Sequence, residues 1–404
     1  MPKSPEHYLQ YMRAHAAEFV TVRQSIHQHP ELGFEEHATS ALVAERLAGW
    51  GYEVERGLGG TGVVGRLQRG KGGASVGIRA DMDALPIEEK TGLAYSSRRP
   101  GIMHACGHDG HTAMLLGAAQ YLATEGEFSG TLNLIFQPAE EGLGGAVRMM
   151  EDGLFEKYPC DAIFAMHNMP GRRQGDLVFR EGPAMASSDY ATVTLHGVGG
   201  HGAMPHLACD PIVAAASIVM ALQTLVSRNA DPQQAAIVTV GAIHSGQANN
   251  VIPQTATLEI SMRALTRETR VLLEQRLKAV VTAQAQSFGV RAEIDFRPGY
   301  AVLLNTPQET EFARGIGRAL VGDAHVEPQA PAVTGSEDFA FMLEKRPGCY
   351  LMIGNGRGGE HGGCMVHNPG YDFHDGNLPI GAAYWALLAE SYLVDAGAAP
   401  AAGR

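Results

Sequence analysis

The sequence has little charge, few aromatic residues and few cysteines. Of its 404 residues, 18% are charged, 7% are aromatic and five are cysteine. The formal net charge of −12 argues against nucleic-acid binding, which needs a basic face. The cysteines are odd in number and scattered, which argues against a disulfide framework and favours the reducing cytoplasm. The sequence shows no signal peptide and no run of about 18 apolar residues, so we expect no membrane association.

The length favours two domains, and most of the chain alternates between strands and helices. This alternation predicts an α/β fold in which helices cover both faces of a mostly parallel sheet. The predicted strands are residues 62–67, 75–80, 131–136, 162–167 and 349–354. The predicted helices are residues 6–28, 36–50, 110–124, 142–152, 307–321 and 379–394.

The middle of the chain follows a different order, β-α-β-β-α-β, which is typical of a ferredoxin-like unit. The strands are expected at 187–196, 235–244, 255–263 and 291–297, and the helices at 209–229 and 267–288. This unit is complete in itself. We therefore predict an inserted domain over 185–300, and a catalytic domain formed by 1–184 and 301–404.

Polar side chains follow three predicted strands of the larger domain. Asp81 and Asp83 follow strand 75–80, the Glu140-Glu141 pair follows strand 131–136, and His167 closes strand 162–167. Ligands of an open α/β sheet bind beyond the carboxyl ends of its strands, so these groups are expected to share one crevice. Cys106 and His108 lie in the loop that enters helix 110–124, at the same edge of the sheet.

Thiolate, imidazole and carboxylate groups are ligands of Zn²⁺ and its first-row neighbours. One glutamate of the pair could bind metal while the other acts as a general base toward metal-bound water. Taken singly, a free cysteine is commonly a buried small apolar residue, and a Glu-Glu pair is commonly a solvated turn. A cysteine nucleophile paired with His167 and Asn168 is a further alternative, but it leaves His108 and the two glutamates without a role.

Together these motifs resemble the M20 family of metallo-aminoacylases and peptidases, most closely its amidohydrolase branch. That branch includes hippurate hydrolases, N-acyl-amino-acid amidohydrolases and auxin-conjugate hydrolases. The resemblance implies an αβα catalytic domain with an inserted lid that commonly carries the dimer contact. It rests on RADMDALP (79–86), MHACGHDGHTAMLLGAA (103–119), FQPAEEGLGGA (136–146), MHNMP (166–170), GVGGHGAMPH (197–206), NNVIP (249–253), TGSEDFA (334–340) and HNPGYDF (367–373).

The resemblance also implies roles for single residues. Cys106 resembles the ligand that bridges two metal ions, an aspartate in other branches of the family. Glu140 matches the general base, Asp83 the acid that orients a ligand, and His201 the histidine that meets the substrate carbonyl oxygen, often across a dimer. The remaining metal ligands are His108, Glu141, His167 and His367. Relatives usually read Asp-Phe-Asn-Asp where this chain has Asp372-Phe373-His374-Asp375, and His374 is left out of the ligand set.

The activity implied is metal-dependent hydrolysis of the amide bond of an N-acyl amino acid. Asn250 and Arg263 are the candidates for binding the substrate carboxylate or carbonyl, and Arg263 could equally be a structural ion pair. Two divalent cations are expected, Zn²⁺ or Mn²⁺, with Co²⁺ or Ni²⁺ as alternatives, in a homodimer or a dimer-based tetramer. The alternative functions are a dipeptidase or carboxypeptidase, a cysteine-nucleophile amidase and a non-catalytic amino-acid binder. Met103, Met185 and Tyr371 are candidates for the acyl pocket.

Overall fold

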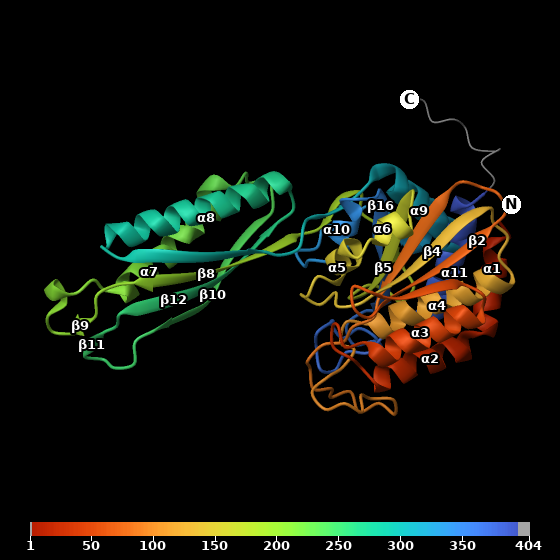
Figure 1. The fold of residues 1–404 in the computed structure, drawn as a ribbon, viewed down its shortest axis with the longest axis horizontal. Helices are drawn as coiled ribbons and strands as arrows, with labels where there is room; N and C mark the ends of the chain where they lie inside the picture. Colours follow the sequence, from red (N-terminus) through yellow and green to blue (C-terminus); the bar gives the residue numbers. More distant parts are fainter. Residues whose placement is uncertain (1, 395–404) are drawn as a thin grey trace, which may run out of the picture. The chain divides into compact units, whose positions relative to one another are not determined.

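A computed structural model describes residues 2–394, and the chain divides into two compact units (Figure 1). The smaller unit comprises Pro183–Leu303 and Ala332–Ala340, and the rest of the chain forms the larger unit. The sequence analysis assigned Ala332–Ala340 to the larger domain. Backbone hydrogen bonds explain the difference, because the Val333 N–H donates to Ala184 (2.9 Å) and the Ala186 N–H donates to Val333 (3.1 Å).

The larger unit is built on an eight-stranded sheet. Its four central strands, in the order β4-β3-β5-β16, are parallel, and the antiparallel pairs lie toward the two sides of the sheet. The predicted α/β class with a mostly parallel core is therefore confirmed. In spatial order the strands are β1 (Glu53–Leu58), β2 (Gly62–Arg69), β4 (Gly130–Gln137), β3 (Ser75–Asp81), β5 (Ala162–Pro170), β16 (Gly348–Gly356), β6 (Leu177–Val178) and β15 (Val326–Glu327).

The helices of the larger unit pack on this sheet and on one another. Helix α4 is the most enclosed, since 14 of its 17 residues are buried, and it packs against α11. A helix that is apolar on all sides is typical of a domain core. The helices are α1 (Pro5–Ala14), α2 (Ala16–Gln28), α3 (His37–Gly49), α4 (His108–Thr124), α5 (Gly145–Glu151), α6 (Leu154–Lys157), α9 (Pro307–Val321) and α11 (Leu378–Tyr392), with α10 (Phe339–Leu343) at the boundary of the units.

The single helix predicted over residues 6–28 is wrong. The chain turns at His15, whose φ and ψ of −103° and 4° separate α1 from α2. Both the backbone N–H and the imidazole Nδ1 of His15 bond to the carbonyl oxygen of Tyr11, at 3.2 Å and 2.8 Å. The His15 side chain therefore bonds to the same carbonyl oxygen as its own backbone N–H, at the point where α1 ends.

The connections between the central strands reverse direction at β3. The chain leaves β3 through α4 to reach β4 on one side, and it leaves β4 through α5 and α6 to reach β5 on the other. Right-handed crossovers place these connections on opposite faces of the sheet. Such a switch point is where α/β sheets bind ligands.

The smaller unit has the predicted β-α-β-β-α-β order. Its strands β8 (Ser187–His196), β10 (Ala236–Ser245), β12 (Thr255–Ala264) and β13 (Arg291–Pro298) form an antiparallel sheet in the order β10-β12-β8-β13. Helices α7 (Pro211–Thr224) and α8 (Arg267–Ser287) pack against it. Two short ladders join β9 (Gly200–His201) to β11 (Val251–Ile252) and β7 (Gly182–Met185) to β14 (Leu303–Asn305).

One described segment, Pro211–Asn229, is long and apolar enough to cross a membrane by length and composition, and a third of it is buried. It consists of α7 and the turn that follows. Its buried residues belong to the core of the smaller unit, where they pack with β8 and β12. One face of the segment is therefore packed in the core of the smaller unit.

Candidate functional site

Side chains from four separate segments converge near the carboxyl ends of β3, β4 and β5. The Cys106 Sγ lies 3.3 Å from the His167 Nε2, and the His367 Nε2 lies 3.3 Å from a Glu141 carboxylate oxygen. The His108 Nε2 is 4.0 Å from the same Glu141 oxygen. The structure thus brings together all five residues predicted as metal ligands: Cys106, His108, Glu141, His167 and His367.

The ligand atoms form two overlapping groups. Within each group every pair of ligand atoms lies within 4.8 Å: one group is Cys106, His108 and His167, and the other is Cys106, Glu141 and His367. Cys106 belongs to both, which is the position a bridging ligand needs. Glu140 belongs to a third group, with His108 and Glu141.

The donor set fits a divalent cation. Thiol, imidazole and carboxylate groups in this number suit Zn²⁺ and other first-row metals. The His108 Nε2 is buried without a hydrogen-bond partner. Buried polar atoms are normally paired, so an unpaired imidazole nitrogen that faces other ligand atoms indicates a group that this cluster is shaped to hold.

Asp83 orients two of the predicted ligands at once. One of its carboxylate oxygens accepts a hydrogen bond from the His108 Nδ1 (3.0 Å), and the other accepts one from the Glu141 backbone N–H (2.9 Å). Because Nδ1 donates to Asp83, Nε2 is the ring nitrogen of His108 that faces the cluster. Support of a histidine ligand by a carboxylate is a common feature of metal sites.

A second buried network lies around His111 and Asn168. The His111 imidazole bonds to Asp81 (2.6 Å) and accepts the Asn168 backbone N–H (3.0 Å), while the Asn168 amide donates to the Cys106 carbonyl (2.6 Å). Gly107 lies against it at φ 89°, and a Cβ there would lie 2.3 Å from the Asn168 amide nitrogen. Only glycine therefore fits between Cys106 and His108.

Arg23 ties the start of α4 to the loop that follows His367. The guanidinium is fully buried and contacts Asp109 (3.3 Å), Asp372 (3.0 Å) and Asp375 (2.8 Å). This connects the segments that carry His108 and His367. Nearby, the His374 Nδ1 accepts the Gly376 N–H (3.0 Å), so this ring caps a turn.

Burial controls the protonation of Cys106 and His167. Burial, together with the carboxylates of Glu141 and Glu140, raises the pKa of the Cys106 thiol well above its usual value. Burial and the neighbouring His111 hold the pKa of His167 well below its usual value. A neutral thiol beside a neutral imidazole is a poor nucleophilic pair. A divalent cation would instead favour the thiolate, so these groups fit the metal-ligand interpretation of Cys106 better than the nucleophile interpretation.

The backbone is strained on either side of the site. Among the described residues, three besides glycine have a positive φ, and two of them are Ala139 (53°), next to Glu140, and His367 (63°). Such conformations persist only where the surroundings enforce them.

At Ala139 the restraint is Glu36, a fully buried carboxylate that accepts the Ala139 N–H (2.8 Å) and the Thr61 hydroxyl (2.5 Å). Sequence reasoning missed Glu36, because its neighbour Glu35 has the same side chain and is exposed.

We expect Glu36→Ala to lower kcat by roughly 10- to 100-fold, because a small displacement of a catalytic group can cost that much. KM and metal content should stay near wild type, since Glu36 touches none of the predicted ligands. Glu36→Gln should recover most of the loss, because its amide oxygen can still accept the Ala139 N–H. Steady-state kinetics of both variants beside the exposed control Glu35→Ala measure this. Equal losses of kcat in Glu35→Ala and Glu36→Ala, or no loss in Glu36→Ala, would show that Glu36 does not position the segment that carries Glu140.

In the smaller unit the structure places His201 beside Asn250. His201 pairs with Val251 in the β9–β11 ladder, and the Gly202 N–H donates to the Asn250 carbonyl (2.8 Å). The His201 Nδ1 accepts the Ala203 N–H (3.0 Å), so in the neutral ring the proton sits on Nε2. Both side chains are exposed, and His201 can donate a hydrogen bond.

Arg263 lies elsewhere in the smaller unit. Strand β12 follows β11 and begins at Thr255. Arg263 lies eight residues farther along this strand, about 26 Å from Thr255 at 3.3 Å per residue. Its guanidinium stacks on the Tyr190 ring at 5.4 Å. The structure thus does not bring Arg263 to His201 and Asn250 within one chain.

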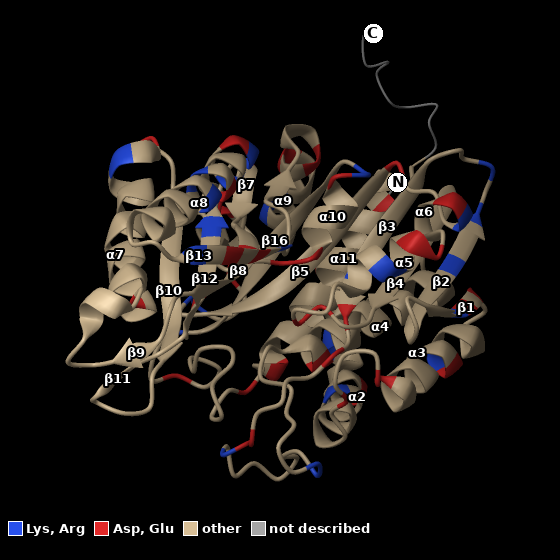
Figure 2. Ribbon diagram, turned by 60° about the vertical axis from the view of Figure 1, so that its left-hand side comes forward, with Lys and Arg blue, Asp and Glu red and all other residues tan. Residues whose placement is uncertain are grey.

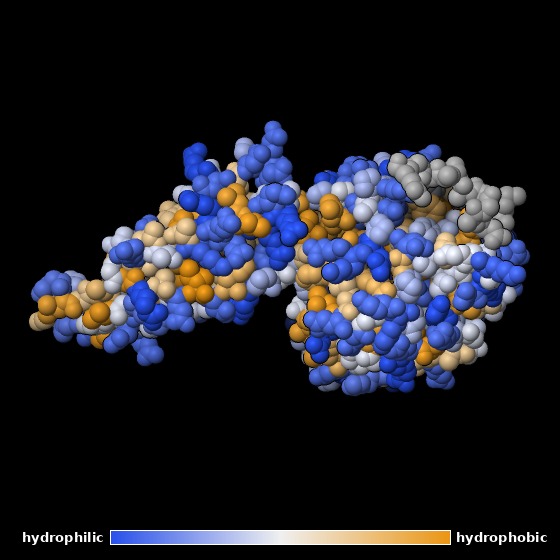
Figure 3. All heavy atoms as spheres, turned by 45° about the horizontal axis from the view of Figure 1, so that its top comes forward, coloured by the Kyte–Doolittle hydropathy of each residue, from blue (hydrophilic) through white to orange (hydrophobic). Residues whose placement is uncertain are grey.

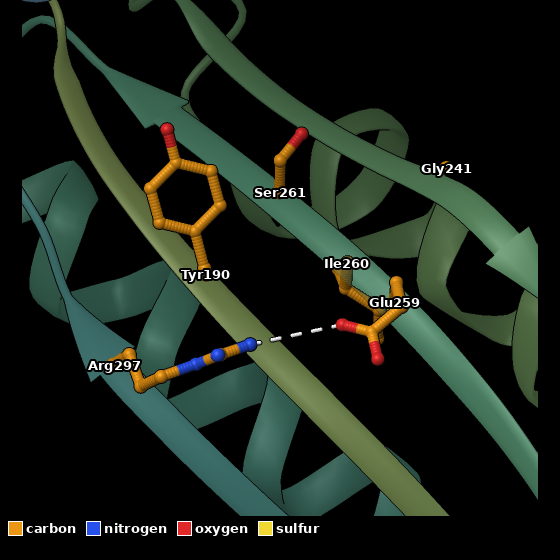
Figure 4. Close-up of a pocket in the computed structure, with 6 residues that line it drawn as sticks. All are labelled: Tyr190, Gly241, Glu259, Ile260, Ser261 and Arg297. Atoms are coloured by element: carbon orange, nitrogen blue, oxygen red, sulfur yellow. Dashed lines mark ion pairs between the residues drawn. The ribbon is translucent and has the colours of Figure 1, made fainter. Parts of the chain in front are cut away.

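Tyr190 also borders a hollow of about 370 Å³ on the sheet of the smaller unit. Figure 4 shows Arg297 of β13 reaching toward Glu259 of β12, an ion pair of 3.7 Å. None of the predicted ligands lines this hollow. It is a surface feature of the sheet, and it contains no part of the ligand cluster.

Comparison with known proteins identifies the family. The model of peptidase family M20/M25/M40 matches residues 77–391, which include the whole ligand cluster. The chain belongs to the M20 peptidase family. It is 45% identical to a hippurate hydrolase of Campylobacter jejuni, over 93% of this chain and 97% of that protein. It is 39% identical to thermostable carboxypeptidase 1 of Saccharolobus solfataricus, over 92% of this chain and 95% of that protein.

A solved structure supports the same assignment. The crystal structure of a Bacillus subtilis dinuclear metal-binding peptidase from the M20 family matches with a TM-score of 0.82 and 32% identity, over 94% of this chain and 99% of that one. The family predicted from the motifs is confirmed. As an M20 member, the protein is a metal-dependent hydrolase of amide bonds.

Proposed function

We propose that this M20 hydrolase cleaves N-acyl amino acids into a carboxylic acid and a free amino acid. The observation that carries the proposal is the ligand cluster in which Cys106 joins two groups of donors, with the Glu140 carboxylate beside them. Similarity to a hippurate hydrolase over nearly the whole chain supports this substrate class.

The cluster is proposed to hold two divalent cations, which would supply an activated water and polarise the amide carbonyl. Zn²⁺ and Mn²⁺ are the first candidates, with Co²⁺ and Ni²⁺ as alternatives. Cys106 is the shared ligand, His108 and His167 complete one group, and Glu141 and His367 complete the other. Asp83 holds His108 and Glu141 in place through its two hydrogen bonds.

Glu140 is the proposed general base. It takes a proton from the attacking water and delivers it to the leaving amine. The His201 Nε2–H is the proposed donor to the oxygen of the reacting carbonyl, and a well-placed donor of this kind contributes about 3–4 kcal/mol. Asn250 beside His201, and Arg263 farther along the unit, are the proposed contacts for the substrate carboxylate or carbonyl.

A homodimer is part of the proposal, and a surface of the smaller unit supports it. Strand β10 is an edge of its sheet, and β10 and α7 carry no Lys, Arg, Asp or Glu (Figure 2). Several apolar side chains are exposed there, among them Met220 (72%), Val213 and Ile243. Figure 3 shows hydrophobic residues at the surface of this unit, including the end that carries β9 and β11. A long uncharged edge strand with an apolar neighbour is the kind of surface that pairs with another chain.

The separation of Arg263 from His201 and Asn250 also supports a homodimer. Arg263 lies about 26 Å along β12 from Thr255, the end of the strand that follows the β9–β11 ladder. Contacts from two such separate parts of the unit can meet at one small molecule if they come from different subunits. We therefore propose that His201 and Asn250 serve the site of the partner subunit. Sedimentation equilibrium of the wild type measures the dimer, and a protein that is monomeric yet fully active would contradict this. A dimer-based tetramer and a cytoplasmic location stay predictions.

Two exposed apolar side chains support an apolar acyl group in the substrate. Leu143 is 55% exposed and stands two residues after Glu141, and Met365 is 53% exposed and stands two residues before His367. Two residues of chain span at most about 7 Å, so both lie close to the ligand pair. Met103, Met185 and Tyr371, suggested from the sequence as pocket residues, are buried.

Replacing Leu143 or Met365 by serine should therefore change specificity more than turnover. We expect kcat/KM for N-benzoyl amino acids to fall about 10-fold, as loss of an apolar contact usually costs 1–3 kcal/mol, with little change for N-acetyl amino acids. Val394→Ser, an exposed apolar residue away from the ligands, is the control. An unchanged benzoyl-to-acetyl ratio would refute the acyl-group proposal and leave the reaction class untouched.

A carboxypeptidase or dipeptidase activity is the second candidate, because of the similarity to a thermostable carboxypeptidase. A hydrolysis screen with added metal over N-acetyl and N-benzoyl amino acids, dipeptides and N-blocked peptides separates the two. Preference for N-acyl amino acids supports the first function, and preference for peptides supports the second.

A further inference from the structure

A cavity of about 530 Å³ in the larger unit lies apart from the ligand cluster. It is bordered by the loop after β5, by the residue that follows β16, and by the segment around β15. Both β5 and β16 are parallel strands of the central sheet, and the cavity lies at their carboxyl ends. This is the edge at which α/β sheets bind small molecules. None of the five metal ligands, and neither Glu140 nor Asp83, lines it.

Basic side chains outnumber acidic ones around this cavity. Arg172, Arg173 and Arg357 face it together with His325, against the two carboxylates of Asp176 and Glu327. The chain as a whole carries a formal charge of −12, so a local excess of arginine runs against its overall balance. A site of one sign can attract a ligand of the other sign within a protein of unfavourable net charge.

The acidic groups are already paired. Glu327 forms an ion pair with Arg172, and Asp176 bonds to the His325 Nδ1 (2.8 Å). Among the described residues, the guanidinium groups of Arg173 and Arg357 have no ion-pair partner, and both side chains are exposed. The cavity therefore presents the guanidinium groups of Arg173 and Arg357 beside the Arg172–Glu327 ion pair and the Asp176–His325 hydrogen bond.

The backbone beneath these arginines is fixed. The Gly171 N–H donates to the Gly356 carbonyl (2.8 Å), and the Gly356 N–H donates to the Arg172 carbonyl (2.9 Å). The Gly354 N–H donates to the Asp176 carbonyl (2.8 Å) in the same pair of segments. The two segments that carry Arg173 and Arg357 are thus joined by backbone hydrogen bonds, and both arginines line the same cavity.

We propose that this cavity is a binding site for a small dianion, a phosphate group or a dicarboxylate, held by Arg173 and Arg357. A guanidinium binds either group through two parallel N–H donors, and two guanidinium groups match a dianion in charge. The site is independent of the proposed hydrolytic function, because it uses none of the catalytic residues.

Calorimetric titration of the metal-loaded protein with inorganic phosphate, and separately with malonate, tests the proposal at an ionic strength held constant with sodium chloride. We expect saturable binding that weakens about 10-fold or more in Arg173→Gln and in Arg357→Gln and disappears in the double variant. Arg148→Gln, an equal change of charge at an exposed arginine paired with Glu151, should bind as the wild type. The relative affinity for phosphate and malonate tells the two sources of the dianion apart.

Two results would overturn the proposal. One is a double variant that binds phosphate as tightly as the wild type, which would place the anion at the metal centre or elsewhere. The other is a wild type that shows no saturable binding of either anion at millimolar concentration. Hydrolysis of an N-acyl amino acid, measured on the same samples, should be equal in all variants, so loss of the anion site cannot be confused with loss of the enzyme.

Discussion

Glu140→Gln is expected to retain its bound metal and to lose hydrolysis by roughly 10²- to 10⁴-fold, the usual contribution of a general base. Glutamine keeps the size of the side chain but cannot accept and release the proton. Glu140 is not among the five proposed ligands, so metal content should stay near wild type. The loss should appear in kcat, since the substrate contacts proposed for His201, Asn250 and Arg263 are unchanged.

The neighbouring glutamate supplies a matched control. Glu141→Gln removes a proposed ligand, so it should lose metal together with activity, whereas Glu140→Gln should lose activity alone. Metal analysis and steady-state kinetics on the same samples separate the two roles. Near-wild-type activity in Glu140→Gln would show that another group is the base, and equal metal loss in both variants would make Glu140 a ligand.

Cys106→Ser is expected to lower metal content and activity together, with a loss of about 10²-fold or more in kcat/KM. Serine cannot supply the thiolate that joins the two groups of ligands, and substitutions even in the shell around metal ligands cost 10- to 100-fold. Cys106→Asp should restore part of both, because a carboxylate can also bridge two cations. The buried Cys160, which contacts Asn133 and Tyr158, provides the control substitution Cys160→Ser.

The same series decides between metal ligand and nucleophile. An aspartate at position 106 cannot perform the chemistry of a thiolate nucleophile in a Cys-His amidase. Recovery in Cys106→Asp therefore supports the ligand role. Cys106→Ser protein that binds metal normally and is inactive, with no recovery in Cys106→Asp, would favour the nucleophile.

The position of the ligand cluster was predictable because it follows from strand order. The runs at 75–80 and 131–136 are followed by Asp81 and by Glu140-Glu141, the run at 162–167 ends in His167, and parallel strands expose their carboxyl ends at one edge of the sheet. His367 is different, since no strand pattern places it beside Glu141. It was assigned through the resemblance to the M20 family, and the fold brings it within 3.3 Å of Glu141.

Other features of the site could not be predicted, because the sequence around them carries no pattern that distinguishes them. Glu36 and Glu35 are identical in side chain, and only the approach of Ala139, 103 residues away, distinguishes the buried one. Arg23 reads as a helix residue, yet it is buried against carboxylates from two distant segments. Strand β1 was missed because its residues, EVERGL, are mostly charged or exposed and carry no apolar pattern. These are consequences of long-range packing, which outweighs local propensity.

The inserted unit shows what a correct secondary-structure prediction leaves open. Its β-α-β-β-α-β order was confirmed, but the order alone did not reveal that Arg263 and His201 stand far apart on it. That spacing follows from the length of β12 and the side ladder of β9 with β11. It is the reason that the proposed substrate site draws on two subunits.

The central claim is that hydrolysis depends on metal held by the cluster around Cys106. The most direct measurement is a titration of demetallated wild-type protein with Zn²⁺ or Mn²⁺, with bound metal and hydrolysis of an N-acyl amino acid measured on each sample. The account predicts no activity without metal and full activity when two ions are bound per subunit. Full activity in the demetallated protein, or bound metal with no effect on hydrolysis, would contradict it.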